Sequence, residues 1–80
     1  MAFALTDDEM GKRVVDAAGT RLGTVETVRD GVAHVSADDA TVAKMQRALE
    51  TGGTGENRYA LDGDSIAEIT DEEVVLDAEY

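Results

Sequence analysis

The sequence contains no cysteine and no proline, and its three aromatic residues, Phe3, Tyr59 and Tyr80, are dispersed along the chain. Without cysteine the chain can form neither a disulfide nor a thiolate nucleophile, and it lacks the cysteine ligands of a structural zinc site. Without proline, no strand loses a backbone hydrogen-bond donor. Three dispersed aromatic rings are too few to stack the bases of a single-stranded nucleic acid.

Basic residues are also scarce. Seven lysines and arginines stand against eighteen acidic residues, which gives a formal net charge of −11 spread from Asp7 to Glu79. Such a surface opposes direct contact with nucleic-acid phosphates and anionic lipids. It also repels itself, and salt screens that repulsion. Because only Lys12 and Lys44 are lysines, we expect a halophilic source, with an acidic mesophilic protein as the alternative.

Large aliphatic side chains and phenylalanine make up about a fifth of the chain, close to the composition of disordered proteins. They are clustered with strand and helix spacing, however, and this predicts a folded domain. The 80 residues predict a single domain over 1–80, small enough for oligomerisation to help its stability. The start, MAFALTDDE, lacks the basic and long apolar parts of a secretion signal, and no run approaches the ~20 apolar residues of a membrane span. We expect a cytoplasmic protein.

The most informative pattern lies at residues 11–30 and predicts a β-hairpin. Val14 and Val15 end a first apolar strand, Ala17-Ala18-Gly19-Thr20 reverses the chain, and a β-branched run continues from 21 to 28. Gly23 interrupts the second strand. A glycine inside a strand indicates a bulge, a barrel corner or the close approach of another strand.

Several further short strands are predicted along the chain. Asp30-Gly31 has the composition of a two-residue hairpin turn, and Asp62-Gly63-Asp64 marks a second turn. The expected strands are a short one at Phe3 and Leu5, and others at 32–36, 58–61, 66–69 and 74–76.

One helix is predicted near residues 40–50. Asp38 or Asp39 can cap it, and Val42, Met45 and Leu49 share one face from about 41 to 50. Thr6-Asp7-Asp8-Glu9 has the spacing of a capping box, but the nearby Gly11 limits any helix there to a single turn. The fold class is therefore mostly β, with about five to six short strands and one helix.

Three local patterns are typical of reactive or binding sites, and each has a structural interpretation that we favour. Asp62 and Glu73 have the outer spacing of a calcium loop, but Ile66 and Ala67 stand where a ligand and a glycine are needed. Gly52-Gly53-Thr54-Gly55 lacks the lysine and the following helix of a phosphate loop. His34, the only histidine, shares a strand face with Val32 and Ser36 and lacks an identifiable catalytic partner. We expect no catalytic residues, no metal and no cofactor.

The first half of the chain resembles a known family. The motif Gly11-x-x-Val14-Val15-Asp16-x-x-Gly19-x-x-Leu22-Gly23-x-Val25-x-x-Val28-x-Asp30 is similar to the opening of a PRC-barrel domain, the small β-barrel of the photosynthetic reaction-centre H subunit and of the ribosome maturation factor RimM. Tyr59-x-Leu61-Asp62 and the segment 66–76 resemble the short, free-standing PRC-barrel proteins of haloarchaea. The resemblance implies a small PRC-type β-barrel, whose fold-defining residues here are Gly11, Asp16, Gly19, Gly23 and Val25.

The same resemblance implies a function. Some haloarchaeal members are cell-division proteins that associate with SepF, the membrane anchor of the FtsZ ring. We therefore expect a non-catalytic adaptor that binds a SepF-type protein or a related PRC-barrel protein, that forms a homodimer, and that a partner recruits to the division site. The alternatives are a RimM-like accessory module that binds a ribosomal protein and a small-ligand-binding barrel. The terminal segments are expected to lie at a sheet edge, where unpaired backbone groups can add a strand from a second subunit. The expected protein interface comprises Phe3, Leu5, Val74, Leu76 and Tyr80.

The acidic composition predicts a salt-dependent stability. Added KCl, in a series up to about 3 M, should raise the midpoint of thermal unfolding, because molar salt screens repulsion beyond about 3 Å. Thermal melts followed by circular dichroism measure this midpoint. A midpoint that stays constant or falls as KCl is added would contradict the prediction of a halophilic protein.

Overall fold

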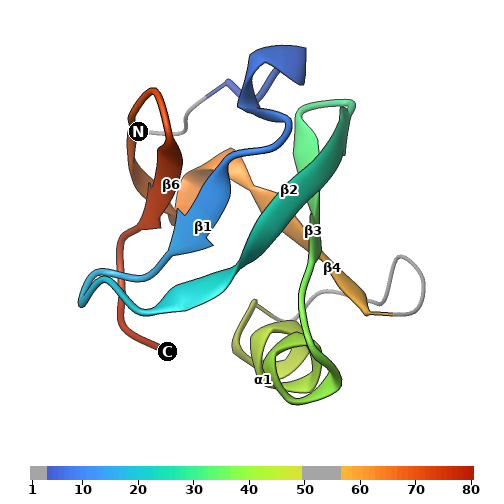
Figure 1. The fold of residues 1–80 in the computed structure, drawn as a ribbon, viewed down its shortest axis with the longest axis vertical. Helices are drawn as coiled ribbons and strands as arrows, with labels where there is room; N and C mark the ends of the chain where they lie inside the picture. The colour runs from blue at the N-terminus through green and yellow to red at the C-terminus, as the bar shows by residue number, and fades with distance from the viewer. Residues whose placement is uncertain (1–3, 50–56) are drawn as a thin grey trace.

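The β-branched run after the first turn forms the longest strand, β2, and the other strands extend the sheet on both of its sides (Figure 1). The structure is a computed structural model that describes residues 4–49 and 57–80. These residues form a six-stranded mixed sheet, one α-helix and two short 3-10 helices. The elements are η1 (Asp7–Glu9), β1 (Arg13–Val15), β2 (Arg21–Arg29), β3 (Val32–Ser36), α1 (Asp39–Leu49), β4 (Arg58–Asp62), η2 (Gly63–Ser65), β5 (Ile66–Ile69) and β6 (Glu73–Leu76).

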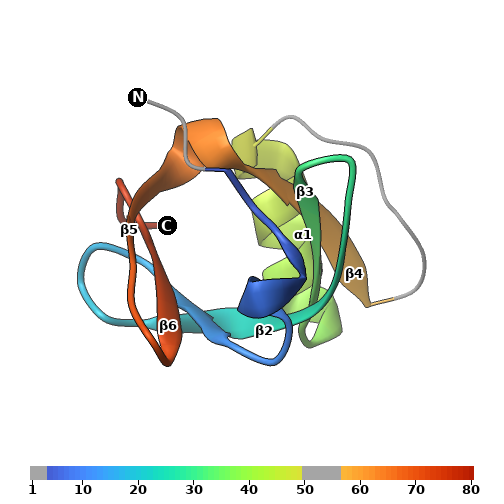
Figure 2. The same ribbon diagram turned by 90° about the horizontal axis from the view of Figure 1, so that it is seen from above.

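The strands lie in the order β4-β3-β2-β1-β6-β5. Neighbours run antiparallel except β1 and β6, which pair in parallel with Val14 opposite Val74. Figure 2 shows that the sheet curls round and that η2 joins its two edge strands, β4 and β5. The strands predicted from residue 14 onward and the helix are confirmed. The sheet is not closed into a barrel, because within residues 4–49 and 57–80 no strand ladder connects β4 with β5.

The hairpin of β1 and β2 forms as predicted, with an irregular register at Gly23. Val14 pairs with Gly23, and the pairing shifts between Val14 and Val15. Gly23 has a φ of +137°, and a Cβ built there would lie 2.5 Å from the carbonyl oxygen of Ser36. The residue must therefore be glycine, because both its backbone conformation and the close approach of β2 to the end of β3 exclude a side chain.

The turn between β2 and β3 also follows the sequence prediction. Asp30 and Gly31 both have positive φ, at 53° and 78°. Positive φ at both central residues gives the turn a twist that matches the twist of the two strands it joins. Val25 pairs with Val35 across this hairpin, and its carbonyl accepts a hydrogen bond of 2.8 Å from the N–H of Gly11.

Apolar side chains from every strand and from α1 fill the inside of the curl. Tyr59 is the largest fully buried side chain, and its hydroxyl donates a hydrogen bond of 2.9 Å to the carbonyl of Leu22. Burial raises the pKa of Tyr59, so the hydroxyl stays protonated and keeps this bond. The buried cluster comprises Leu5, Val14, Leu22, Val25, Ala33, Val35, Val42, Met45, Tyr59, Leu61, Ile66, Val74 and Leu76.

The helix α1 begins two residues before the predicted position. The Asp38 carboxylate accepts a hydrogen bond of 2.8 Å from the N–H of Thr41, so Asp38 and not Asp39 caps the helix. Val42 and Met45 are buried and Leu49 packs on the core, which confirms the predicted apolar face. Its predicted end at Glu50 lies outside the described residues, as does the loop at 51–56.

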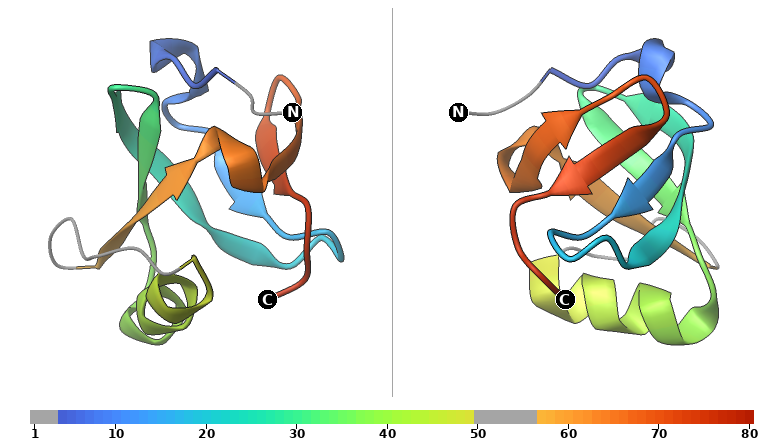
Figure 3. Two further views of the ribbon diagram at one scale, coloured as in Figure 1. Left: turned by 180° about the vertical axis from the view of Figure 1, so that it is seen from behind. Right: turned by 60° about the vertical axis from the view of Figure 1, so that its left-hand side comes forward.

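Asp16 is a buried carboxylate that connects the β1–β2 turn to the residues after β6. Its Oδ1 accepts hydrogen bonds of 2.9 Å from the N–H groups of Ala18 and Thr20, and its Oδ2 accepts one of 3.3 Å from the N–H of Tyr80. Lys44 of α1 donates to the backbone oxygen of Tyr80. Figure 3 shows residues 77–80 running from β6 past the β1–β2 turn toward α1. Asp16 thus fixes both the turn and this last segment.

The residues predicted for a protein interface do not lie at a sheet edge in the part of the chain that the structure describes. We expected Val74 and Leu76 at a sheet edge, but β6 lies between β1 and β5, so this placement is wrong. Both side chains are fully buried, and Leu5 is 5% exposed. Tyr80 is half-buried and packs against the core. Phe3 lies outside the described residues.

The N-terminal segment differs from its prediction in one respect. Residues 4–6 form no strand, so the prediction of a first strand is wrong at Leu5. Leu5 is held instead by burial in the core. The capping box is confirmed, since Thr6 and Glu9 exchange hydrogen bonds around the single turn η1.

Replacing Gly23 should destabilise the protein more than replacing a glycine in open space. We expect Gly23→Ala to lower the free energy of unfolding by about 3 kcal/mol, because backbone strain is added to a clash with backbone atoms. Gly19→Ala is the control, because Gly19 also has positive φ but a Cβ there meets nothing within 4 Å. Its expected cost is about 1 kcal/mol. Urea unfolding at constant salt measures both values, and equal costs would contradict the close approach.

The stability of the protein should also depend on the charge of Asp16. Burial raises the pKa of this carboxyl, but hydrogen bonds from Thr20, Tyr80 and Ala18 outweigh the burial and bring the pKa below its ordinary value of 3.8. The carboxylate therefore stabilises the fold above the ordinary pKa, and this contribution is lost as the pH falls through the lowered value. Asp16→Asn should lower the thermal midpoint at neutral pH, and the difference from wild type should shrink below about pH 4.

Asp71→Asn is the matched control for this experiment, because Asp71 is exposed. It removes the same charge without a buried hydrogen-bond network, so its midpoint should stay close to that of wild type. Thermal melts from pH 7 to about pH 3 at one salt concentration give the midpoints of wild type and both variants. A difference between Asp16→Asn and wild type that is constant over this range would count against the role of the carboxylate.

Candidate functional site

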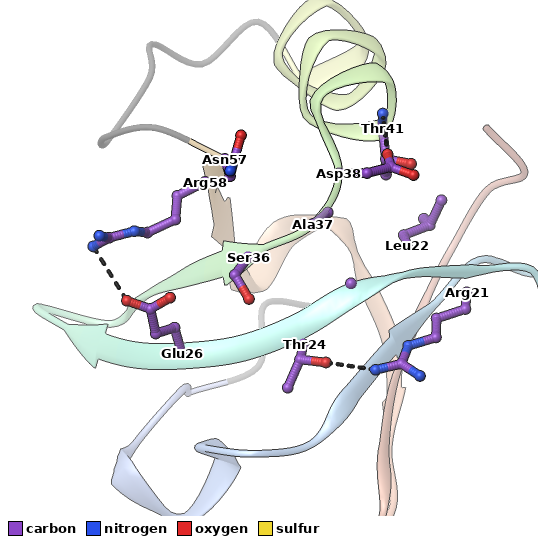
Figure 4. A pocket seen from close by; sticks show the side chains of 11 residues that line it. Arg21, Leu22, Thr24, Glu26, Ser36, Ala37, Asp38, Thr41, Asn57 and Arg58 are labelled. Atoms are coloured by element: carbon purple, nitrogen blue, oxygen red, sulfur yellow. Dashed lines mark hydrogen bonds and ion pairs between the residues drawn. The ribbon is translucent and has the colours of Figure 1, made fainter.

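A groove lies where the middle of β2 passes the end of β3, the beginning of α1 and the beginning of β4 (Figure 4). We call it the β2 groove. Its volume is about 620 Å³, and it is open to solvent along one side. It is lined by Arg21, Leu22, Gly23, Thr24, Glu26, Ser36, Ala37, Asp38, Thr41, Asn57 and Arg58.

The floor of the groove depends on the absence of a side chain at Gly23. A Cβ at this position would meet the Ser36 carbonyl at 2.5 Å, a methyl of Val35 at 2.7 Å and the Cβ of Ala37 at 3.2 Å. Since Ser36 and Ala37 both line the groove, the glycine lets the chain leave β3 close to β2. The bulge predicted from the sequence therefore shapes this surface.

The β3–α1 connection forms one wall and is held by two polar contacts. The N–H of Ala37 donates a hydrogen bond of 3.0 Å to the carbonyl of Asn57, which has a positive φ of 60°. Asp38 caps α1 through Thr41. Hydrogen bonds from the Thr41 hydroxyl and N–H lower the pKa of Asp38, so its carboxylate is charged at neutral pH.

Two arginines line the groove from different strands. Figure 4 shows the pair of Arg58 and Glu26 toward one end of the drawn part of β2, and the pair of Arg21 and Thr24 toward the other. The Nη1 of Arg58 lies 3.3 Å from Oε1 of Glu26, and the Nη2 of Arg21 donates a hydrogen bond of 2.8 Å to the Thr24 hydroxyl. Both arginine side chains remain partly accessible to solvent. The groove therefore offers cationic donors beside hydroxyl and amide groups.

A second, smaller hollow of about 420 Å³ lies near η1 and the β5–β6 turn. It contains Lys12 and Arg13, but also Asp8, Asp71 and Glu72. Arg13 already forms contacts of 3.6 Å with both Glu72 and Glu73. This hollow therefore has more acidic side chains than the β2 groove. Its arginine contacts two carboxylates, whereas Arg58 contacts one and Arg21 contacts a hydroxyl.

Of the residues singled out from the sequence for chemistry, those that the structure describes line neither hollow. His34 is half-buried in β3 and pairs with Thr27 and Ala60 of the neighbouring strands, on the predicted face with Val32 and Ser36. Asp62 caps η2 through the N–H of Asp64, as a turn residue would. Gly52-Gly53-Thr54-Gly55 lies outside the described residues.

Within the described parts of the chain, no group of three or more histidine, cysteine or acidic side chains is arranged to hold a metal ion. Over the same residues, no helix has the length and apolar character needed to cross a membrane.

Sequence reasoning did not find the β2 groove. Arg21 and Arg58 are distant in the chain, and only the pairing of β2 with β3 and of β3 with β4 brings them to one surface. Gly23 was the one available signal, because its position in a strand indicated a close approach. It did not indicate which residues would surround that approach.

Comparison with known proteins places the chain in a family. No curated protein and no solved structure matches it. The model of a family of unknown function, DUF8593, matches residues 4–76, which include every strand and helix described above. The chain therefore belongs to the family of unknown function DUF8593.

Proposed function

We propose that the protein is a non-catalytic adaptor of the PRC-barrel type, and that it binds another protein at the β2 groove. The observation that carries this proposal is the form of the groove. It is open to solvent, and hydrogen-bonding side chains from β2, β3, β4 and α1 line it. Sites for small molecules are usually more enclosed and mostly apolar. An open polar groove is better suited to a segment of another protein.

The acidic groups of the groove also support a binding role. Glu26 forms an ion pair with Arg58, and Asp38 caps the first turn of α1. A general base needs a carboxylate that is free to take a proton from a substrate. These two carboxylates instead already have partners within the groove. The Asp38 contact fixes the start of α1, so this wall of the groove is preformed, as suits a recognition surface.

The PRC-barrel resemblance favours a partner from the archaeal division machinery, either a SepF-type protein or a related PRC-barrel protein. The partner would meet a mainly polar surface, because Met10 is the one large apolar side chain that is strongly exposed in the described residues. Recruitment through such a partner would bring the adaptor to the division site. The homodimer stays a prediction from the small size of the chain.

Affinity purification in high salt tests the proposal. Tagged wild-type protein, used as bait in a lysate of its source organism, should recover SepF-type and FtsZ-ring components. Thr24→Tyr places a ring in the groove and should reduce recovery about tenfold, which corresponds to about 1.4 kcal/mol of binding free energy. Thr20→Tyr is the control, because Thr20 is exposed in the β1–β2 turn, outside the groove.

Mass spectrometry identifies and quantifies the captured proteins. Recovery of ribosomal proteins in place of division proteins would contradict the division role and favour the RimM-like alternative. Equal recovery with Thr24→Tyr and Thr20→Tyr would exclude the groove as the contact surface. A substrate turnover that His34→Ala abolishes in a folded protein would contradict the non-catalytic role.

A further inference from the structure

The arginines of the β2 groove stand out against the charge of the whole chain. The protein has a net charge of −11 and only seven basic residues. Two of these seven, Arg21 and Arg58, line the β2 groove. We propose that the groove binds an extended acidic segment of the partner protein, with carboxylates of that segment anchored on Arg21 and Arg58. This inference rests on the proposed adaptor function and names the chemistry of its partner.

The hydrogen-bonding state of the two arginines supports this assignment. Arg21 donates to the Thr24 hydroxyl, and no carboxylate lies within ion-pair distance of it among residues 4–49 and 57–80. A guanidinium has five N–H donors in a planar fork that fits a carboxylate. Arg58 shares one ion pair of 3.3 Å with Glu26, and its side chain is 39% exposed. Both arginines therefore keep donors for an incoming carboxylate.

The acidic side chains of the groove leave the two arginines able to bind a further carboxylate. The Asp38 carboxylate accepts hydrogen bonds from the N–H and hydroxyl of Thr41 at the start of α1. In the described residues it forms no ion pair with Arg21 or Arg58. Glu26 is the carboxylate nearest to an arginine, and the contact is exposed on both sides, at 39% and 46%. Exposed ion pairs of this kind contribute little free energy, so a partner carboxylate can replace Glu26 beside Arg58 at low cost.

The rest of the surface directs an acidic segment to this groove by repelling it elsewhere. The second hollow has three acidic side chains beside Lys12 and Arg13, and Arg13 is held between Glu72 and Glu73. Nucleic acids and anionic membranes extend far beyond one groove and would meet the acidic surface around it. A short protein segment can place carboxylates in the groove alone.

High salt favours direct contacts over long-range attraction. At molar salt, charge interactions are screened beyond about 3 Å, but a hydrogen-bonded guanidinium and carboxylate are within that distance. The hydroxyls of Thr24, Ser36 and Thr41 and the amide of Asn57 add uncharged partners for the backbone of the segment. Recognition of this kind operates under the same conditions that suit an acidic chain.

A peptide-binding measurement tests the inference. The probe is a fluorescein-labelled peptide of about ten residues that alternates Asp with Thr, and its neutral counterpart has Asn in place of Asp. Fluorescence anisotropy in about 1 M KCl gives the dissociation constants. We expect wild type to bind the Asp peptide at least about tenfold more tightly than the Asn peptide.

Charge-matched variants separate the groove from general electrostatics. Arg21→Gln with Arg58→Gln should weaken binding of the Asp peptide at least about tenfold. Arg29→Gln with Arg47→Gln changes the net charge equally on exposed residues outside both hollows, and should leave binding close to wild type. The single variant Arg21→Gln removes only the exposed contact to Thr24 and should show a smaller loss in the same direction. Circular dichroism melts in the same salt verify the fold of each variant.

Three results would overturn the inference: no binding of the Asp peptide by wild type, equal binding of the Asn peptide, or equal weakening by the two double variants. The purification experiment shows which proposal has failed. If Arg21→Gln with Arg58→Gln captures the same proteins as wild type, the acidic-segment inference fails while the adaptor function stands. If wild type itself captures no division protein, the proposed function fails.

Discussion

The close approach of β2 to the end of β3 at Gly23 is the constraint on which the other features of the structure depend. β2 pairs with β1 on one side and with β3 on the other, so a change of its backbone affects both hairpins. At Gly23 the strand takes a positive φ, and a Cβ built there would lie 2.5 Å from the carbonyl oxygen of Ser36. This contact fixes where β3 ends and α1 begins, and it forms the floor of the β2 groove.

Buried polar groups then hold the curled sheet in register. The Tyr59 hydroxyl joins β4 to β2 through the Leu22 carbonyl, although the two residues are 37 positions apart. Asp16 joins the β1–β2 turn to the segment after β6. In a chain with few large aliphatic residues, such bonds supply specificity that the apolar core alone does not, because an unpaired buried polar group is costly. They also explain how an open sheet keeps one shape without closing into a barrel.

Charge acts at two scales in this protein. Over the whole surface the net charge of −11 opposes the approach of polyanions, and we expect it to make folding depend on salt. Within the β2 groove, arginines from β2 and β4 and hydroxyls from three elements make a surface that differs from its surroundings. The binding surface that we propose needs no apolar patch, which agrees with the near absence of exposed large apolar side chains in the described residues.

Local structure could be predicted from the sequence: the 11–30 hairpin, the Asp30-Gly31 turn, the capping box at Thr6, the helix face of Val42 and Met45, and most strand bounds. These features follow from backbone preferences and short-range spacing, which depend only on residues that are close in the sequence. The burial of individual strands and the position of the groove could not be predicted in this way, because both depend on which strands pair. The parallel pairing of β1 with β6 buried Val74 and Leu76, which we expected at a sheet edge because they belong to a terminal segment. The pairing of β2, β3 and β4 brought Arg21 and Arg58 to one groove. No pattern in the sequence encodes a juxtaposition of residues so far apart, because it arises only when the sheet is assembled.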